Sequence, residues 1–169
     1  MQPNRRSNPS VASFESSSSR ARKYFGWLLA RREYAASELT SKAKQKGYEQ
    51  QHIDEALEFL QTHGLQDDNR YAGMKARQSA PRWGNNRIAQ VLKFKKVDDE
   101  IVQAQLLELP HESERAWHVI ERYEHDEWTP ELHQKAWRRL ATRGFGTATI
   151  KFALKRLRSK DASDGVDDR

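Results

Sequence analysis

Residues 82–92 read RWGNNRIAQVL and hold the pattern that decides the fold. Within them stand an aromatic residue, Trp83, a small residue, Gly84, and two aliphatic residues four positions apart, Ile88 and Leu92. Residues four apart lie on one face of an α-helix. The small residue allows that helix to begin close to a neighbouring segment. The stretch therefore predicts a tight turn, an aromatic side chain that packs inward, and a helix with one buried face.

The same pattern occurs twice more in the chain. Its other copies are Tyr34-Ala35 with Leu39 and Ala43, and Phe145-Gly146 with Ile150 and Leu154. The copies start 49 and 62 residues apart, and the longer interval has room for one extra short helix. Small tandem units bury little by themselves and stack on their neighbours. We therefore predict units that share interfaces; the alternative is a coincidental match within one compact bundle.

The whole body of the chain has helical periodicity and lacks the alternation typical of strands. In one segment, for example, Ile101, Ala104 and Leu107 form an apolar stripe. The predicted helices are 21–31, 36–46, 50–62, 67–79, 84–95, 98–108, 111–124, 130–143 and 146–158. The predicted fold class is all-α: tandem three-helix repeats in an elongated, curved array of about nine helices.

The domain organisation follows from these runs and from composition. Both ends of the chain are too polar to offset the entropy of ordering, so we expect disorder there. The predicted divisions are a disordered Ser/Arg-rich tail at 1–20, repeat 1 at 21–65, repeat 2 at 66–109, repeat 3 with an extra helix at 110–158, and a disordered tail at 159–169.

Composition excludes several classes of protein. Among the 169 residues there is no cysteine, which excludes a disulfide scaffold, a thiolate zinc site and a cysteine nucleophile. No apolar run approaches the roughly 20 residues that span a bilayer. The basic N-terminus lacks the apolar segment of a secretory signal. We expect a monomeric cytoplasmic protein without a membrane segment.

Two long runs of sequence contain basic residues and no acid. They are residues 69–96 and 132–160, within a chain whose net charge is +6. Separated basic faces on an elongated scaffold suit a long polyanionic or acidic partner. The simpler alternative is a pair of ordinary solvated helix faces. The first repeat is mixed in sign, so we expect it to contribute less.

No arrangement of residues indicates catalysis, a metal or a cofactor. His118, Glu121 and His125 have a helical spacing that could hold a metal, but no further ligand pattern accompanies them. Adjacent Asp67 and Asp68 are better interpreted as a helix cap than as an acid–base pair. Asn85, Asn86 and Arg87 resemble part of a base-reading helix, but an N-cap explains Asn85 or Asn86 equally well.

Four features together resemble a known family. They are Leu65-Gln66-Asp67-Asp68-Asn69-Arg70-Tyr71-Ala72; the spacing from there to Arg82-Trp83-Gly84 and Ile88; the run Lys135, Leu140, Arg143-Gly144-Phe145 and Ile150; and the three-repeat layout. Over residues 24–157 the chain is similar to the RecX family of bacterial RecA regulators. Family members more often have a smaller residue and a glycine-led turn where this chain has Trp83 and Lys95-Lys96-Val97.

The resemblance implies a non-enzymatic regulator in recombination, DNA repair and the SOS response. Such a protein binds the RecA filament on single-stranded DNA and mainly inhibits its ATPase, strand-exchange and co-protease activities, with weak direct DNA binding. The alternative is a stand-alone, sequence-nonspecific nucleic-acid-binding helical protein. The basic blocks supply the candidate partner- or DNA-binding residues: Arg77, Arg82, Trp83, Arg87, Lys93, Lys95, Lys96, Arg138, Arg139, Arg143, Lys151, Lys155 and Arg156.

Overall fold

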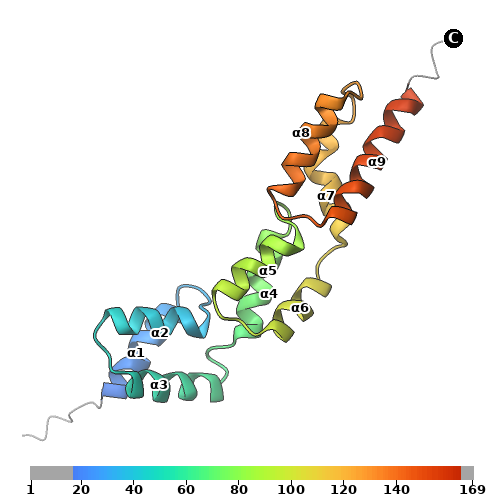
Figure 1. The fold of residues 1–169 in the computed structure, drawn as a ribbon. Coiled ribbons are helices and arrows are strands. Elements are labelled where there is room, and N and C mark those ends of the chain that lie inside the picture. The colour runs from blue at the N-terminus through green and yellow to red at the C-terminus, as the bar shows by residue number, and fades with distance from the viewer. Residues whose placement is uncertain (1–16, 165–169) are drawn as a thin grey trace, which may run out of the picture.

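A computed structural model describes the backbone of residues 17–164 and the side chains up to residue 159. Its helices are α1 (Ser17–Leu29), α2 (Ala36–Gln45), α3 (Gln50–Thr62), α4 (Asp68–Ser79), α5 (Asn85–Phe94), α6 (Asp99–Leu107), α7 (Glu112–Ile120), the 3₁₀ turn η1 (Glu121–Tyr123), α8 (Pro130–Ala141) and α9 (Thr147–Asp164). The described residues contain no strand. Figure 1 shows an elongated, curved array, which confirms the predicted all-α fold class.

Both outer helices extend into segments predicted to be disordered. Helix α1 begins at Ser17, because Ala21 is already fully buried and needs a helical turn before it. Helix α9 continues past Leu157, the last buried residue among its described side chains, since no glycine or proline interrupts the chain before Gly165. The rest of the predicted tails, 1–16 and 165–169, lies outside the described residues.

Three separate apolar cores organise the array, one for each group of three helices. In each group the first helix packs against the third: α1 on α3, α4 on α6, and α7 on α9. The cores include Phe25, Leu39 and Ile53 in the first group, Ile88 and Leu92 in the second, and Ile120, Leu140 and Leu157 in the third. Of the first group only Ala35 joins the core of the second. The apolar cores therefore stay largely separate, and the described contacts between neighbouring groups are mainly polar.

Helix α6 buries a different face from the predicted one. The predicted stripe is Ile101, Ala104 and Leu107. Leu107 is 86% exposed and Ala104 is exposed, whereas Val102 and Gln105 are buried. The side-chain amide of Gln105 donates to Asn69 Oδ1 on α4 at 2.9 Å. This polar contact satisfies a buried glutamine that a hydrophobic pattern does not predict.

The second helix of each group is followed, two or three residues after its end, by a residue with a left-handed backbone. These residues are Gly47 (φ 84°), Lys96 (φ 57°) and Gly144 (φ 77°). After Lys96, the Val97 amide donates to Leu92 O at 3.2 Å, and the same bond closes the other two helices. Lys96 therefore occupies the position that glycine takes in the other two groups.

The third copy of the sequence repeat has a different place from the first two. The first two copies precede α2 and α5, the second helices of their groups, whereas Phe145-Gly146 precedes α9, a third helix. The longer interval is filled by α7 and the single turn η1 (Figure 1). Within the described residues the third group thus holds three α-helices and η1.

Candidate partner and nucleic-acid interface

The second and third groups meet backbone to backbone. The Gly84 amide donates to Arg143 O at 2.9 Å, and the Asn86 amide donates to Gly144 O at 3.2 Å. A Cβ added to Gly84 would lie 2.4 Å from Gly144 O, so a side chain cannot be accommodated there without movement. The turn before α5 and the turn before α9 are thereby held together, although about 60 residues separate them in sequence.

We call the contact between the first and second groups the first joint and the contact between the second and third groups the second joint. A buried arginine closes the second joint. Arg115 on α7 is only 5% exposed. Its guanidinium donates to Trp83 O at 2.7 Å, to Pro110 O at 2.9 Å and to Ala80 O at 3.4 Å, and it also bonds Asn85 Oδ1. Burial lowers the pKa of Arg115, and the charge of Glu112 on the same helix opposes that shift. One cation thus ties α7 to the carbonyls that end α4 and begin α5.

Each joint also has a carboxylate that accepts a hydrogen bond from the backbone amide at the start of a helix in the neighbouring group. Glu112, the first residue of α7, accepts from the Asn85 amide at 2.6 Å and from Thr149 Oγ1 at 2.7 Å. Asp68, the first residue of α4, accepts from the Ala36 amide at 2.9 Å. A negative charge at a helix N-terminus is stabilising. The interpretation of Asn85 or Asn86 as an N-cap is wrong: Gly84 is the N-cap, and Glu112 supplies the carboxylate.

The predicted cap at Asp67 is confirmed, and the three residues His118, Glu121 and His125 do not share one helix. Asp67 Oδ1 accepts from the amides of Asn69 at 2.7 Å and Arg70 at 3.2 Å. His118 Nδ1 lies 3.1 Å from Glu121 Oε2, but α7 ends before His125. Across the described residues no group of three or more acidic or histidine side chains is placed to hold a metal ion.

Cations from two distant segments gather at the second joint. A Cβ on Gly144 would lie 2.6 Å from Arg87 Cβ, which places Arg87 of α5 directly against the turn that follows α8. Beside that turn lies a groove of about 480 Å³, which we call the cationic groove. Its lining residues are Tyr123, Glu131, Gln134, Lys135, Arg138, Arg139, Thr142 and Arg143.

The cationic groove is weakly neutralised. Burial and the charge of Arg139 both lower the pKa of Arg143. Arg139 Nε donates to Val119 O at 3.0 Å, and Arg143 donates to Arg139 O at 3.1 Å, so backbone carbonyls hold both guanidiniums. None of the four groove cations forms an ion pair in the part of the chain that the structure describes. An anion would relieve this repulsion.

Elsewhere the fold brings acids to the candidate cations, although the sequence runs contain none. The ion pairs are Arg77–Glu108 at 4.0 Å, Lys93–Asp99 at 2.9 Å, Lys95–Glu38 at 3.1 Å and Arg156–Glu114 at 3.1 Å. Such surface pairs contribute about 0–1 kcal/mol, and a partner can displace them. Arg82 and Lys96 are exposed and appear in none of these pairs.

Lys95 has a structural role in the first joint. Its ammonium binds Glu38 Oε1 at 3.1 Å, and Ser37 Oγ donates to its carbonyl oxygen. Burial would raise the pKa of Glu38, but Lys95 and Arg32 lower it below its ordinary value. Burial next to Glu38 also raises the pKa of Tyr71 to about 12. Lys95 therefore links α5 to α2 while its side chain remains partly exposed.

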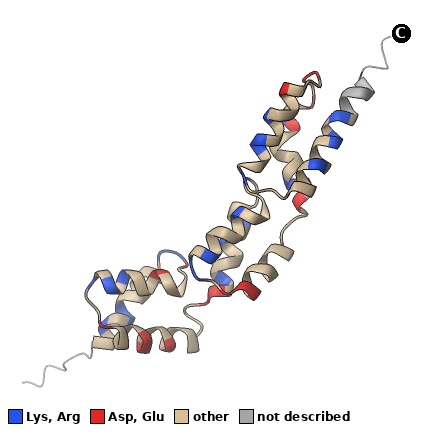
Figure 2. Cartoon of the chain, in the orientation of Figure 1, with Lys and Arg blue, Asp and Glu red and all other residues tan. Residues whose placement is uncertain are grey.

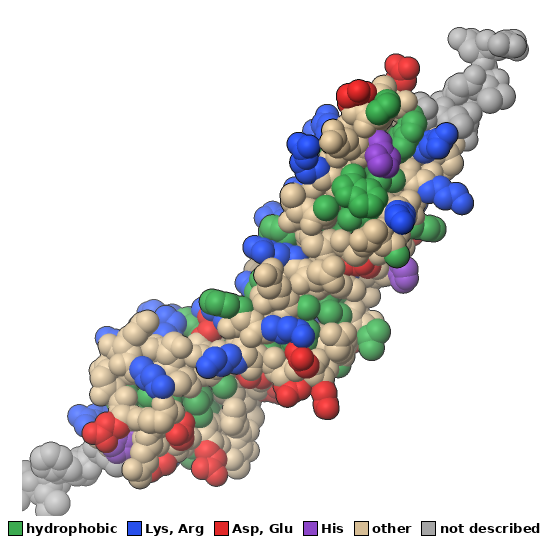
Figure 3. Space-filling model, in the orientation of Figure 1, with side chains coloured by type: hydrophobic (Ala, Val, Ile, Leu, Met, Phe, Trp, Pro, Cys, Tyr) green, Lys and Arg blue, Asp and Glu red, His purple; other side chains and the backbone are tan. Residues whose placement is uncertain are grey.

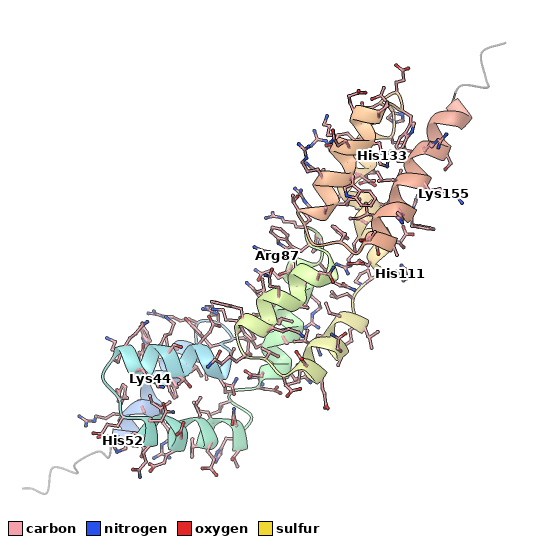
Figure 4. The ribbon with its side chains drawn as sticks, viewed as in Figure 1. Lys44, His52, Arg87, His111, His133 and Lys155 are labelled. Atoms are coloured by element: carbon pink, nitrogen blue, oxygen red, sulfur yellow. The ribbon has the colours of Figure 1, made fainter. Side chains whose placement is uncertain are left out.

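The second basic block of the sequence is divided between two margins of the array. In Figure 2 the cations of α8 lie on the left margin, on the same side as those of α5, and the cations of α9 lie on the right. In Figure 4, Arg87 and Lys155 accordingly point away from each other. Helix periodicity alone places residues around one helix but does not relate two helices, so the sequence did not show this division.

Trp83, a predicted binding residue, also packs against the second core. Its ring is half-buried against the second core, and the Arg87 guanidinium lies 5.4 Å from the ring centroid. Sequence reasoning left out Arg115 and Glu112, which build the joint, and Lys135, which lines the cationic groove. A lone arginine or glutamate in an amphipathic helix has no sequence signal that distinguishes it from a solvated one.

Comparisons with known proteins agree with this architecture. The family described as "RecX, first three-helix domain" matches residues 21–60, and "RecX, second three-helix domain" matches residues 67–106. None of the helices in the described part of the chain has the length and apolar character needed to cross a membrane.

Relatives and solved structures extend the similarity beyond these two domains. The chain is 32% identical over 128 residues to "Regulatory protein RecX" of Actinobacillus pleuropneumoniae serotype 5b. The match covers 72% of this chain and 82% of the relative. The chain is also 32% identical over 136 residues to the protein of the same name from Vibrio vulnificus, covering 75% and 86%. The crystal structure of RecX from Lactobacillus salivarius superposes with a TM-score of 0.76 at 22% identity, over 85% of this chain and 97% of that chain.

Proposed function

Because the chain belongs to the RecX family of regulatory proteins, we propose that it binds the RecA filament on single-stranded DNA and mainly inhibits its ATPase, strand-exchange and co-protease activities. The proposed partner is the RecA filament with its single-stranded DNA, the acting species is a monomer in the cytoplasm, and the role is regulatory rather than enzymatic. The observation that carries the proposal is the cationic groove at the second joint, with Arg87 placed against the turn at its edge.

The geometry suits a long partner better than a small one. The array is elongated, and the cations of α5 and α8 lie along one margin of it (Figure 2). The bonds of the Gly84 and Asn86 amides to Arg143 O and Gly144 O hold the start of α5 against the turn that follows α8, so the cations of both helices meet a partner as one preorganised surface. An extended polyanion, or a filament surface that combines acids and phosphates, can contact the whole margin at once.

A second candidate function is stand-alone, sequence-nonspecific nucleic-acid binding. The guanidiniums of the cationic groove favour it, because they form no ion pair among the described residues and phosphates can bind them without a protein partner. The two functions differ in their dependence on salt. Direct DNA binding weakens steeply as salt rises, whereas contacts with a protein surface persist.

The test is inhibition of DNA-dependent ATP hydrolysis by RecA at two salt concentrations. We expect the double variant Arg82→Glu/Arg138→Glu to inhibit at least tenfold less well than the unaltered protein. Both side chains are exposed and appear in no ion pair that the structure shows, so their loss should leave folding intact. If both contact phosphate, the slope of log affinity against log salt should also fall by about two units.

The matched control is Lys44→Glu/Lys46→Glu, which makes the same change of charge in the first group, where Lys44 is marked in Figure 4. We expect it to inhibit nearly as well as the unaltered protein, with circular dichroism confirming that both variants are folded. Greater damage in the control would show that the wrong surface has been chosen. Absence of inhibition by the unaltered protein, at a salt concentration that suppresses DNA binding, would refute filament regulation and leave the second candidate.

A further inference from the structure

A second groove runs between α8 and α9, on the face seen in Figure 3. We call it the aromatic groove; its volume is about 220 Å³. The lining residues are Trp128, His133, Trp137, Lys151, Leu154, Lys155 and Arg158. Figure 3 shows apolar side chains and a histidine gathered on this face, with basic side chains beside them on α9. In Figure 4, His133 and Lys155 lie on the two facing helices.

One wall of the aromatic groove is made of rings. The Trp128 and His133 rings are 5.6 Å apart at 80°, and the His133 and Trp137 rings are 6.1 Å apart at 33°. Both tryptophans pack against the third core and are half-buried, so each ring is held in place with part of its surface open. Cations cover the rings of Trp27, Trp83 and Trp117 in this structure. No such contact is found for Trp128 or Trp137 among the described side chains.

The other wall is a row of cations. Lys151, Lys155 and Arg158 are exposed and follow one face of α9, with an axial rise of about 6 Å between the first two. No acid lines the aromatic groove. None of the three cations forms an ion pair within the described part of the chain. Aligned cations without opposing charge attract a ligand with a row of negative charges.

We propose that the aromatic groove is a separate nucleic-acid site that binds unpaired nucleotides. A base stacks on the indole of Trp128 or Trp137, and the adjoining phosphates lie on Lys151 and Lys155. Stacking on an aromatic ring is available to any base whose face is exposed, and it is closed to bases inside a duplex. An acidic peptide would satisfy the cations but would leave the aromatic wall unused, so the pairing of both walls favours a nucleotide.

The aromatic groove differs in chemistry from the cationic groove. The one aromatic residue lining the cationic groove is Tyr123, and its ring is approached by Lys135 at 4.8 Å and Arg122 at 5.6 Å. The cationic groove can therefore bind phosphate irrespective of base pairing, whereas the aromatic groove distinguishes unpaired from paired strands. This inference does not rest on the proposed function, because it predicts binding when no recombinase is present.

The test measures the anisotropy of labelled oligonucleotides with the full chain alone. The three probes are an oligothymidylate, an abasic oligonucleotide of the same length, and a duplex. We expect the oligothymidylate to bind about tenfold more tightly than the abasic strand, a difference of about 1.4 kcal/mol. Trp128→Leu/Trp137→Leu should abolish that preference and leave the affinity for the abasic strand unchanged. The matched control is Trp27→Leu, because the Arg31 guanidinium covers the Trp27 indole at 3.6 Å. This variant should change neither the preference for the oligothymidylate nor the affinity for the abasic strand.

A second variant keeps the test decisive if the tryptophan variant fails to fold. Lys151→Gln/Lys155→Gln alters only exposed side chains, and it should weaken both single strands equally while the tenfold preference persists. Equal affinity of the unaltered protein for the thymidylate and abasic strands would overturn the proposal. So would displacement of the oligothymidylate by polyglutamate at the same concentration of charge. Neither result would affect inhibition of RecA through the cationic groove.

Discussion

Replacement of Arg115 by methionine should weaken the second joint by about 3 kcal/mol. Methionine keeps much of the side-chain volume but removes every donor. The two shortest bonds to backbone carbonyls, to Trp83 O at 2.7 Å and Pro110 O at 2.9 Å, are lost. A hydrogen bond from a charged group contributes about 1.5–3 kcal/mol. The lower end applies, because a costly buried charge also disappears.

The assay is urea unfolding followed by circular dichroism and by tryptophan fluorescence. Each group has its own core, so loss of the joint should also separate the unfolding of the second and third groups. The two probes should then give different midpoints in Arg115→Met and one shared midpoint in the unaltered protein. Arg122→Met is the control, since Arg122 is exposed and lies 5.6 Å from the Tyr123 ring. It should lose less than about 1 kcal/mol.

A loss in Arg115→Met no larger than in the control, with coincident midpoints, would refute the argument. It would mean that the backbone contact between Gly84 and Gly144 holds the groups together without the arginine. The same variant should inhibit RecA less well if the cationic groove needs Arg87 and Arg143 in a fixed relation.

Two further predictions concern the first joint and the turn beside it. Lys96→Gly should raise the free energy of unfolding by about 0.5–1 kcal/mol. A left-handed backbone costs a non-glycine residue about 1–2 kcal/mol, and glycine avoids that cost. Part of the gain is lost because glycine also has more conformational entropy in the unfolded chain. Thermal denaturation checks it, and Lys96→Ala should show no such gain. The lowered pKa of Glu38 stabilises the fold above about pH 4.5, and this contribution is lost as the pH falls below that value. The stability difference between the unaltered protein and Glu38→Gln should therefore shrink from pH 6 to pH 3; a constant difference would contradict the role of the Lys95 ion pair.

Local spacing was sufficient to predict that the chain is helical and where most of the inner helices lie. Predicted segments such as 50–62 and 84–95 match α3 and α5 to within a residue, and Ile88 and Leu92 are buried as their spacing indicated. Such features depend on contacts within one or two turns, which the sequence shows directly. The resemblance to RecX also followed from ordered motifs, and the comparisons confirm the family.

Sequence patterns did not show which residues would meet across groups. The two acid-free runs of sequence predicted cations without ion-pair partners. In the structure, however, Glu38 pairs with Lys95 and Glu114 pairs with Arg156, from segments some 40–60 residues away. In the same way, nothing local marks Arg115 as buried. Such contacts join distant segments, so no periodicity records them.

The sequence by itself determined that this chain is a string of short helices with thin, repeated cores and an excess of positive charge. Only the tertiary structure decided where that charge is effective. In the folded protein, Arg87 lies against the turn after α8, and distant carboxylates pair with other cations. The cations of α8 and α9 lie on opposite margins of the array. The physical reason is that the field at a surface depends on distances in space, and in this protein those distances are set by polar joints between helices rather than by any one helix.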